Sequence, residues 1–111
     1  MAYDEALAAR VRVLLSDTPD LSERKMFGGL AFLVGEHMAV VASGKGGLMI
    51  RVDPTSSEEL VAATAARFAE MRGRQMRGWL RLDAAHVQTP RDLAKWVNMS
   101  KKYVRTLPAN I

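Results

Sequence analysis

The fold is decided by residues 26–52, which read MFGGLAFLVGEHMAVVASGKGGLMIRV. Two apolar runs, residues 26–34 and 38–42, are separated by a very short loop, and a loop of that length predicts a hairpin. The glycine-rich turn at residues 43–47 leads into a third apolar run, residues 48–52. Because neither connection is long enough for a crossover helix, we expect three consecutive antiparallel strands.

Two amphipathic helices are predicted near the ends of the chain. Apolar residues recur at helical spacing over residues 3–14, which indicates a helix with one buried face. Near the other end, Thr89 has the side chain of an N-cap and Pro90 suits the first helical position. An apolar stripe continues from there to Pro108. We therefore expect a long second helix after residue 89.

Between these segments, the sequence predicts one more helix and a second hairpin. Ser56 is followed three residues later by Glu59, the pattern of a capping box, so a helix is expected to begin near Ser57. Residues 68–82 favour a hairpin, because apolar and charged residues alternate after a turn at residues 72–75. The predicted element order is α-β-β-β-α-β-β-α, which implies an α+β fold with helices over one face of an antiparallel sheet.

Length and composition fit a single globular domain over residues 1–111. The chain is 49% hydrophobic and 25% charged, in the ordinary range for folded proteins. Its longest uninterrupted apolar runs have five residues, whereas a membrane span needs about 20. Acidic residues stand near the N-terminus, where an export signal would be basic. We expect a cytoplasmic protein that makes no membrane contact.

The residue inventory excludes several classes of chemistry. The chain has no cysteine, which excludes disulfides, thiol catalysis and thiolate metal sites. Its two histidines, His37 and His86, are far apart in the sequence and belong to no metal-binding motif. No P-loop, dinucleotide fingerprint or serine nucleophile elbow is present. We expect no enzymatic activity, no cofactor and no metal.

Positive charge is concentrated in the C-terminal part of the chain. Residues 1–66 contain six Lys or Arg against nine Asp or Glu, and residues 67–111 contain ten against three. Residues 71–81, MRGRQMRGWLR, place four arginines around Trp79, and guanidinium forks and an indole can bind phosphates, carboxylates and bases. The candidate contact residues are Arg72, Arg74, Arg77, Trp79, Lys101 and Lys102.

A second interpretation of these residues remains open. Trp79 could be a sheet residue covered by the aliphatic stems of arginines, and the dipole of the last helix accounts for Lys101 and Lys102. Met26 and Phe27 offer another candidate partner surface. Alternatively, Phe27 belongs to the core, and Gly28 and Gly29 permit a bulge or a close approach of two backbones. In either interpretation, residues 26–29 are expected to define the fold.

Several stretches together resemble the TfoX N-terminal domain family over about residues 3–108. They are KMFGG at 25–29, LMIRVDP at 48–54, MRGRQMRGW at 71–79, and Leu93, Trp96, Val97 and Tyr103 before Leu107-Pro108. The resemblance implies an α+β domain similar to the secretion-chaperone-like folds, with an antiparallel sheet of five to six strands flanked by helices. In the name-giving members this domain is joined to a C-terminal helical domain.

The resemblance also implies a class of function. The name-giving members regulate natural transformation by assisting a transcription activator at competence promoters. We expect this chain, which ends at Ile111, to be a stand-alone domain of this type without the C-terminal domain. The expected function is a non-enzymatic interaction module that binds a protein partner or itself, as an accessory to transcriptional regulation. Direct binding of nucleic acid through the basic C-terminal half is the alternative.

Overall fold

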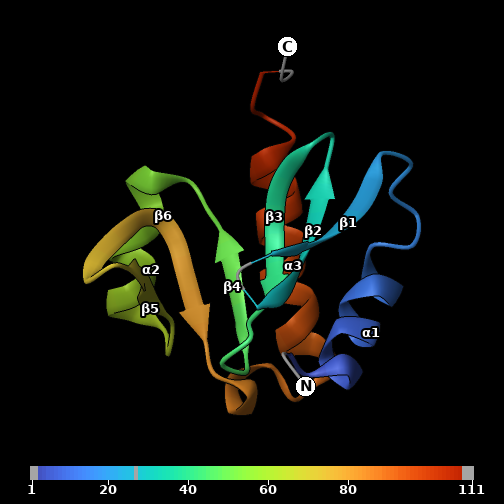
Figure 1. The fold of residues 1–111 in the computed structure, drawn as a ribbon. Coiled ribbons are helices and arrows are strands. Elements are labelled where there is room, and N and C mark those ends of the chain that lie inside the picture. Colours follow the sequence, from blue (N-terminus) through green and yellow to red (C-terminus); the bar gives the residue numbers. More distant parts are fainter. Residues whose placement is uncertain (1–2, 27, 109–111) are drawn as a thin grey trace.

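The computed structural model describes residues 3–26 and 28–108, which form a two-layer α+β domain (Figure 1). Its six strands make one sheet, antiparallel throughout, in the order β1-β2-β3-β4-β6-β5. No helix within these residues is long and apolar enough to cross a bilayer. In chain order the elements are α1 (Glu5–Leu14), β1 (Leu21–Met26), β2 (Gly29–Val34), β3 (His37–Ala42), β4 (Leu48–Arg51), α2 (Ser57–Ala63), β5 (Arg67–Met71), β6 (Arg74–Leu82) and α3 (Pro90–Val104).

The predicted hairpins and terminal helices are confirmed. β2, β3 and β4 pair consecutively, and β5 pairs with β6. At the start of α3, Thr89 Oγ1 accepts a hydrogen bond from the Asp92 N–H at 3.1 Å. At the start of α1, Asp4 Oδ1 accepts one from the Leu7 N–H at 3.0 Å. Loop length, helical spacing of apolar residues and the Thr89 cap therefore located these elements correctly, whereas the Asp4 cap was not predicted.

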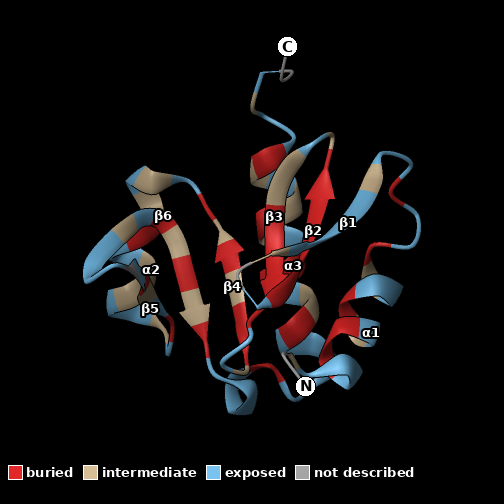
Figure 2. Ribbon diagram, in the orientation of Figure 1, coloured by how far each residue is buried: buried red, intermediate tan, exposed pale blue. Residues whose placement is uncertain are grey.

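The predicted element order lacked one strand. The apolar run at residues 26–34, expected to be a single strand, divides into the end of β1 and the whole of β2. β1 lies at the edge of the sheet, and its residues 22–25 are exposed (Figure 2). Because buried and exposed residues do not alternate along β1, its sequence shows no two-residue period that would predict a strand. The observed order is α-β-β-β-β-α-β-β-α.

The predicted capping box at Ser56 does not form. α2 begins at Ser57 as expected, but the Ser56 side chain makes no capping hydrogen bond. Ser56 has φ −99° and ψ −9°, whereas an N-cap is extended, because a 3₁₀ turn at Pro54–Ser56 precedes the helix. Asp53 Oδ1 starts that turn by accepting the Thr55 N–H at 2.9 Å. This backbone hydrogen bond, together with one from the Thr55 hydroxyl, lowers the pKa of Asp53.

The helices cover one face of the sheet, as predicted. α3 runs behind β3 and β4, α1 lies against α3, and α2 packs on β5 and β6 (Figure 1). The core between the two layers includes Phe32, Ile50 and Leu80 from the strands and Val11 and Val97 from the helices, all fully buried. Burial of large apolar side chains is the main favourable contribution to folding.

One buried polar contact joins the two layers. The hydroxyl of Ser100, on α3, is fully buried and donates a hydrogen bond to the Ala39 carbonyl at 2.7 Å. Phe32 pairs with Val40 and Leu33 with Met38, so Ala39 is an extra residue that interrupts the ladder. Its carbonyl needs a partner outside the sheet, and Ser100 supplies it.

Gly29 lies where the backbones of β2 and β3 approach closely. A Cβ added at this position would overlap the carbonyl oxygen of Ala42 in β3, so no larger residue fits without moving main-chain atoms. Gly28 has a positive φ of 73° in the turn between β1 and β2, with open space around its absent side chain. The two glycines therefore serve different purposes, and the predicted close backbone approach is confirmed for Gly29.

We expect Gly29→Ala to lower the free energy of unfolding by about 2–3 kcal/mol, because the added methyl displaces the backbone of β3. Gly28→Ala is the matched control. It meets no atom but adopts a left-handed backbone, so its expected cost is about 1 kcal/mol. Urea denaturation followed by circular dichroism measures both. Equal costs for the two variants would contradict the close approach at Gly29.

A second prediction concerns the ion pair between α1 and β1. Arg12 donates to both carboxylate oxygens of Glu23 at 2.6 and 2.9 Å, and this hydrogen bonding lowers the pKa of Glu23. The stabilisation is present above the unfolded pKa of Glu23 and is lost as the pH falls through the lower folded pKa. Glu23→Gln should therefore flatten the decline in stability below about pH 5.

Denaturant unfolding at several pH values tests this prediction. Glu36→Gln is the control, because Glu36 is an exposed turn residue that forms no ion pair with any described residue. It should leave the pH profile unchanged. Parallel profiles for the wild type and Glu23→Gln would show that the Arg12 pair contributes nothing to folding.

Candidate functional site

Strand alternation gives the sheet a second apolar face. Ala31, Leu33 and Val41 form its centre and are 0%, 5% and 1% exposed. In the described part of the chain, this cluster contains no residue from α1, α2 or α3. Partly buried side chains from four strands surround the centre, namely Met26, Met38, Met49 and Trp79. These seven residues define what we call the open face.

The open face is surrounded by positive charge. Arg24, Arg51 and Arg81 lie on it, because each is the cross-strand partner of one of its residues. The carboxylates within the strands, Glu23 and Glu70, lie on the opposite, helix-covered side by alternation with core residues. The strands therefore bring arginines to the open face and no carboxylate of their own; the Asp83 carboxylate, directly after β6, is paired with Arg67, the cross-strand partner of Arg81.

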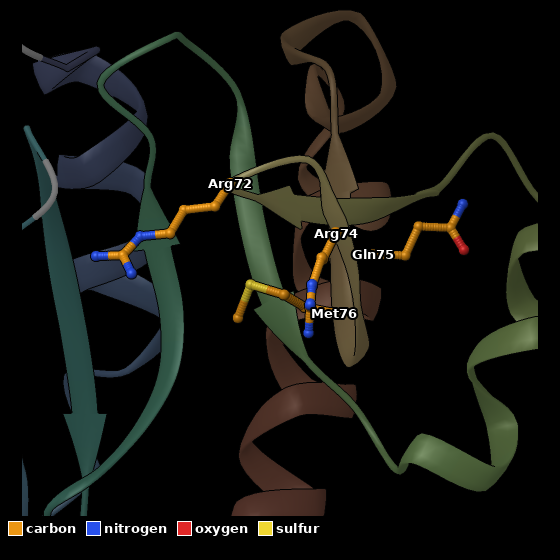
Figure 3. A pocket seen from close by; sticks show the side chains of 4 residues that line it. All are labelled: Arg72, Arg74, Gln75 and Met76. Atoms are coloured by element: carbon orange, nitrogen blue, oxygen red, sulfur yellow. The ribbon is translucent and has the colours of Figure 1, made fainter.

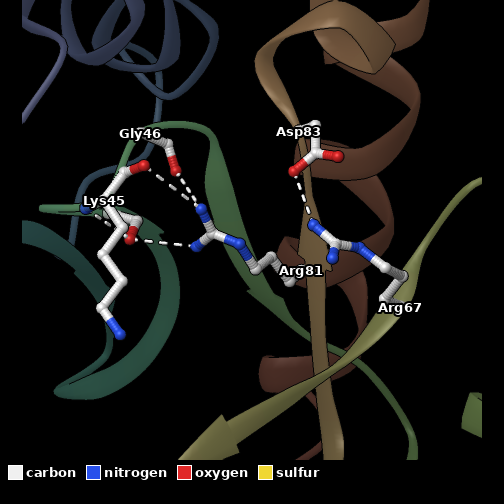
Figure 4. Close-up of polar contacts among 6 residues, drawn as sticks. Lys45, Gly46, Arg67, Arg81 and Asp83 are labelled. Carbon is white, nitrogen blue, oxygen red and sulfur yellow. Dashed lines mark hydrogen bonds and ion pairs between the residues drawn. The ribbon is translucent and has the colours of Figure 1, made fainter.

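Arg81 is committed to the structure of a neighbouring loop. Its guanidinium donates to Ser43 Oγ at 3.1 Å, to the Gly46 carbonyl at 2.7 Å and to the Lys45 carbonyl at 3.4 Å (Figure 4). These bonds hold the glycine-rich turn at residues 43–47, which the sequence indicated to be a tight turn and not a phosphate-binding loop. The planar fork of arginine suits three acceptors at once.

The other strand arginines differ in how fully they are engaged. Arg67 forms an ion pair with Asp83 at 2.6 Å (Figure 4). The Arg51 guanidinium carbon lies 6.0 Å from the centre of the Trp79 ring, a cation–π arrangement. Arg24 is exposed, and neither it nor Arg51 forms an ion pair with a described residue. Arg24 and Arg51 therefore keep their hydrogen-bond donors available.

The tip of the β5–β6 hairpin adds two more arginines. Arg72, at φ 53°, and Gly73, at φ 78°, make the tight turn. A shallow hollow beside it is lined by Arg72, Arg74, Gln75 and Met76. In Figure 3 the Arg72, Arg74 and Met76 side chains lie on one side of the hairpin and Gln75 points away. Arg74 and Met76 pair with Met71 and Ala69, beyond the register shift that follows Phe68 in β5.

The structure brings together only some of the predicted contact residues. Trp79 is part of the open face, and Arg72 and Arg74 line a hollow at the tip of the same hairpin. The Arg77 guanidinium is turned toward the Pro54 carbonyl, 3.5 Å away. Lys101 and Lys102 belong to the last turn of α3, in the helical layer.

Lys101, Met26 of the fold motif and His37 each make a contact that the structure describes. Lys101 pairs with Asp17 at 3.5 Å, so part of the basic charge is used within the helical layer. Met26 contacts the open-face cluster. Phe27 lies outside the described residues, and the prediction that it joins the core or a partner surface is untested. His37 Nε2 is hydrogen-bonded to the Pro108 carbonyl at 2.7 Å.

Sequence reasoning missed most of the open face. Met38, Met49 and Arg51 were assigned to apolar strands without regard to which side they face. The signal was present in Leu48-Met49-Ile50-Arg51, where alternation separates Met49 and Arg51 from two core residues. Trp79 was predicted to lie among the arginines of its own hairpin, but the guanidinium over its ring belongs to Arg51 of β4.

The family model described as the TfoX N-terminal domain matches residues 13–103. This chain belongs to the TfoX N-terminal domain family. A comparison with curated proteins gives no match. The matched span contains every strand of this TfoX N-terminal domain and all of its open face.

A third prediction compares Arg81 and Arg67, two strand arginines whose guanidiniums are bonded to other residues of the chain. Arg81→Ala removes three hydrogen bonds and should lower the free energy of unfolding by about 1–2 kcal/mol. It should also speed amide hydrogen exchange in residues 43–47. Arg67→Ala is the control, because it removes one exposed ion pair and should cost less than about 0.5 kcal/mol. Loop exchange that is equally slow in both variants would contradict the role given to Arg81.

Proposed function

We propose that this TfoX N-terminal domain is a non-enzymatic interaction module that binds a protein partner through its open face. We further propose that this contact makes it an accessory to transcriptional regulation of the competence type. The observation that carries the proposal is the apolar cluster on the face of the sheet that receives no helix. Apolar patches rimmed by polar residues are typical of protein interaction sites.

The composition of the open face supports a protein partner in particular. Methionine and tryptophan are enriched at the centres of protein interfaces, together with arginine. Met26, Met38 and Met49 surround the buried centre, and Trp79 and Arg51 stack at one end. Flexible thioether side chains adjust to the shape of an incoming side chain. The face can therefore receive apolar groups without rearrangement of the strands.

The non-enzymatic part of the proposal is supported by the residue chemistry. The sequence contains no cysteine and none of the phosphate-binding or nucleophile motifs considered above. Within residues 3–26 and 28–108, no three His, Asp or Glu side chains gather in a way that could hold a metal ion.

Direct nucleic-acid binding is the alternative, and it is the weaker one because the basic residues predicted to carry it do not lie on one surface. A nucleic-acid interface requires cations along one continuous surface. Here Arg72 and Arg74 lie on the hairpin, whereas Lys101 and Lys102 lie in the helical layer. The guanidinium of Arg81 is already occupied by three acceptors.

Affinity capture from cell extract with the intact chain as bait tests the proposed function. We expect a specific set of captured proteins that is lost with Met38→Ser/Met49→Ser, because the substitutions make the open face polar. Val13→Ser is the matched control, since Val13 is an exposed apolar residue on α1, 71% accessible. It should retain the same proteins. Circular dichroism establishes that each variant is folded.

Two outcomes would contradict this function. One is capture of the same proteins by the wild type and the open-face variant. The other is binding of a DNA duplex of about 20 base pairs that weakens steeply with salt, by a slope of about −0.9 for each phosphate contacted. Loss of that binding in Arg72→Ala/Arg74→Ala/Arg77→Ala would favour the nucleic-acid alternative.

A further inference from the structure

The open face combines an apolar centre with arginines that have no acidic partner. Arg24 and Arg51 come from β1 and β4, and Arg72 and Arg74 come from the hairpin tip. None of the four forms an ion pair with a residue in the described part of the chain. Arg12 of α1 and Arg67 of β5, by contrast, pair with carboxylates of this chain. Arg24 and Arg51 therefore bring guanidiniums without an ion pair to the open face, and Arg72 and Arg74 bring two more to the tip of the adjoining hairpin.

We propose that the open face binds an acidic amphipathic segment of a partner protein. The apolar side chains of that segment would contact the methionines and Trp79, and its carboxylates would pair with Arg24, Arg51, Arg72 and Arg74. This inference rests on the proposed function and specifies the chemistry of the partner. Arginine forks bind carboxylates through two parallel hydrogen bonds, which adds direction to the attraction.

Charge complementarity selects this partner over a second copy of the chain. In a two-fold contact between two open faces, each arginine would meet the same positively charged surface on the other copy. Like charges placed opposite one another oppose such a contact. The strands contribute no carboxylate to the open face that could relieve this repulsion, and Asp83, directly after β6, is already paired with Arg67.

The aromatic content of the open face disfavours a single-stranded nucleic acid. Such ligands stack successive bases on several aromatic side chains. Trp79 is the one aromatic side chain among the described residues of the open face, and Arg51 already lies over its ring. The remaining surface consists of thioether and aliphatic groups. These groups fit apolar side chains better than bases.

Selection from a displayed library of random peptides tests the proposal. The intact chain is the target, and the peptides have about 16 residues, enough for roughly four helical turns. The enriched peptides should combine Asp and Glu with Leu, Ile or Phe at regular spacing. Synthetic copies should bind the wild type in fluorescence anisotropy, and their affinity should fall at least about tenfold in Arg72→Glu/Arg74→Glu.

The chain offers a control with the same change in charge. Arg91→Glu/Lys102→Glu alters two exposed cations of α3, in the helical layer, and should leave peptide affinity unchanged. Replacement of the peptide carboxylates by lysine should abolish binding to the wild type and restore binding to Arg72→Glu/Arg74→Glu. Such an exchange of preference would not follow from a general loss of folding.

The failure of this inference and the failure of the proposed function have different signatures. Enriched peptides without acidic bias, whose binding is lost in Met38→Ser/Met49→Ser, would overturn the acidic partner and leave the proposed function intact. Enrichment that is absent, or insensitive to every open-face substitution, would overturn both. Dimers in light scattering that dissociate in Met38→Ser/Met49→Ser would assign the face to a second copy. Binding of a thymidine oligonucleotide lost in Arg72→Glu/Arg74→Glu would assign it to nucleic acid.

Discussion

The architecture depends on strands that are apolar on both sides. All six residues of β2 are buried, and so are the last four of β3. In most antiparallel sheets one face is apolar and the other is hydrated, so residues alternate in polarity along each strand. Here alternation separates two apolar sets, and α1, α2 and α3 cover only one of them. Among the residues that the structure describes, the second set is covered by long side chains from the strands themselves.

This arrangement determines which parts of the fold could be predicted from the sequence. The central strands and α3 were predictable, because apolar runs, short loops and the Thr89 cap are local signals. β1 was not predictable, because four of its residues are exposed and its sequence shows no alternation of buried and exposed positions. The capping box failed for a related reason. Asp53-Pro54 begins a 3₁₀ turn and takes Ser56 out of N-cap geometry.

The candidate site was less predictable than the fold, because it depends on register across several strands. The hairpin with Arg72, Arg74 and Trp79 was recognised from adjacent residues, but Arg51 reaches Trp79 only through the pairing of β4 with β6. The number of basic residues in the sequence also overestimates how many charged side chains are free to bind a partner. Arg81 is hydrogen-bonded to a loop, and Lys101 is paired with Asp17. Which charged side chains remain unpaired depends on the tertiary structure.

The position of α3 bears on when the domain can fold during its synthesis. This helix supplies Leu93, Trp96, Val97 and Val104 to the core, and Ser100 satisfies a carbonyl that lies 61 residues earlier in the chain. Until residues 90–104 have left the ribosome, β3 and β4 lack the helix that packs on them, and the Ala39 carbonyl lacks its Ser100 partner. Completion of the core therefore waits for the last helix, and contacts between residues so far apart in sequence are typical of slower folding.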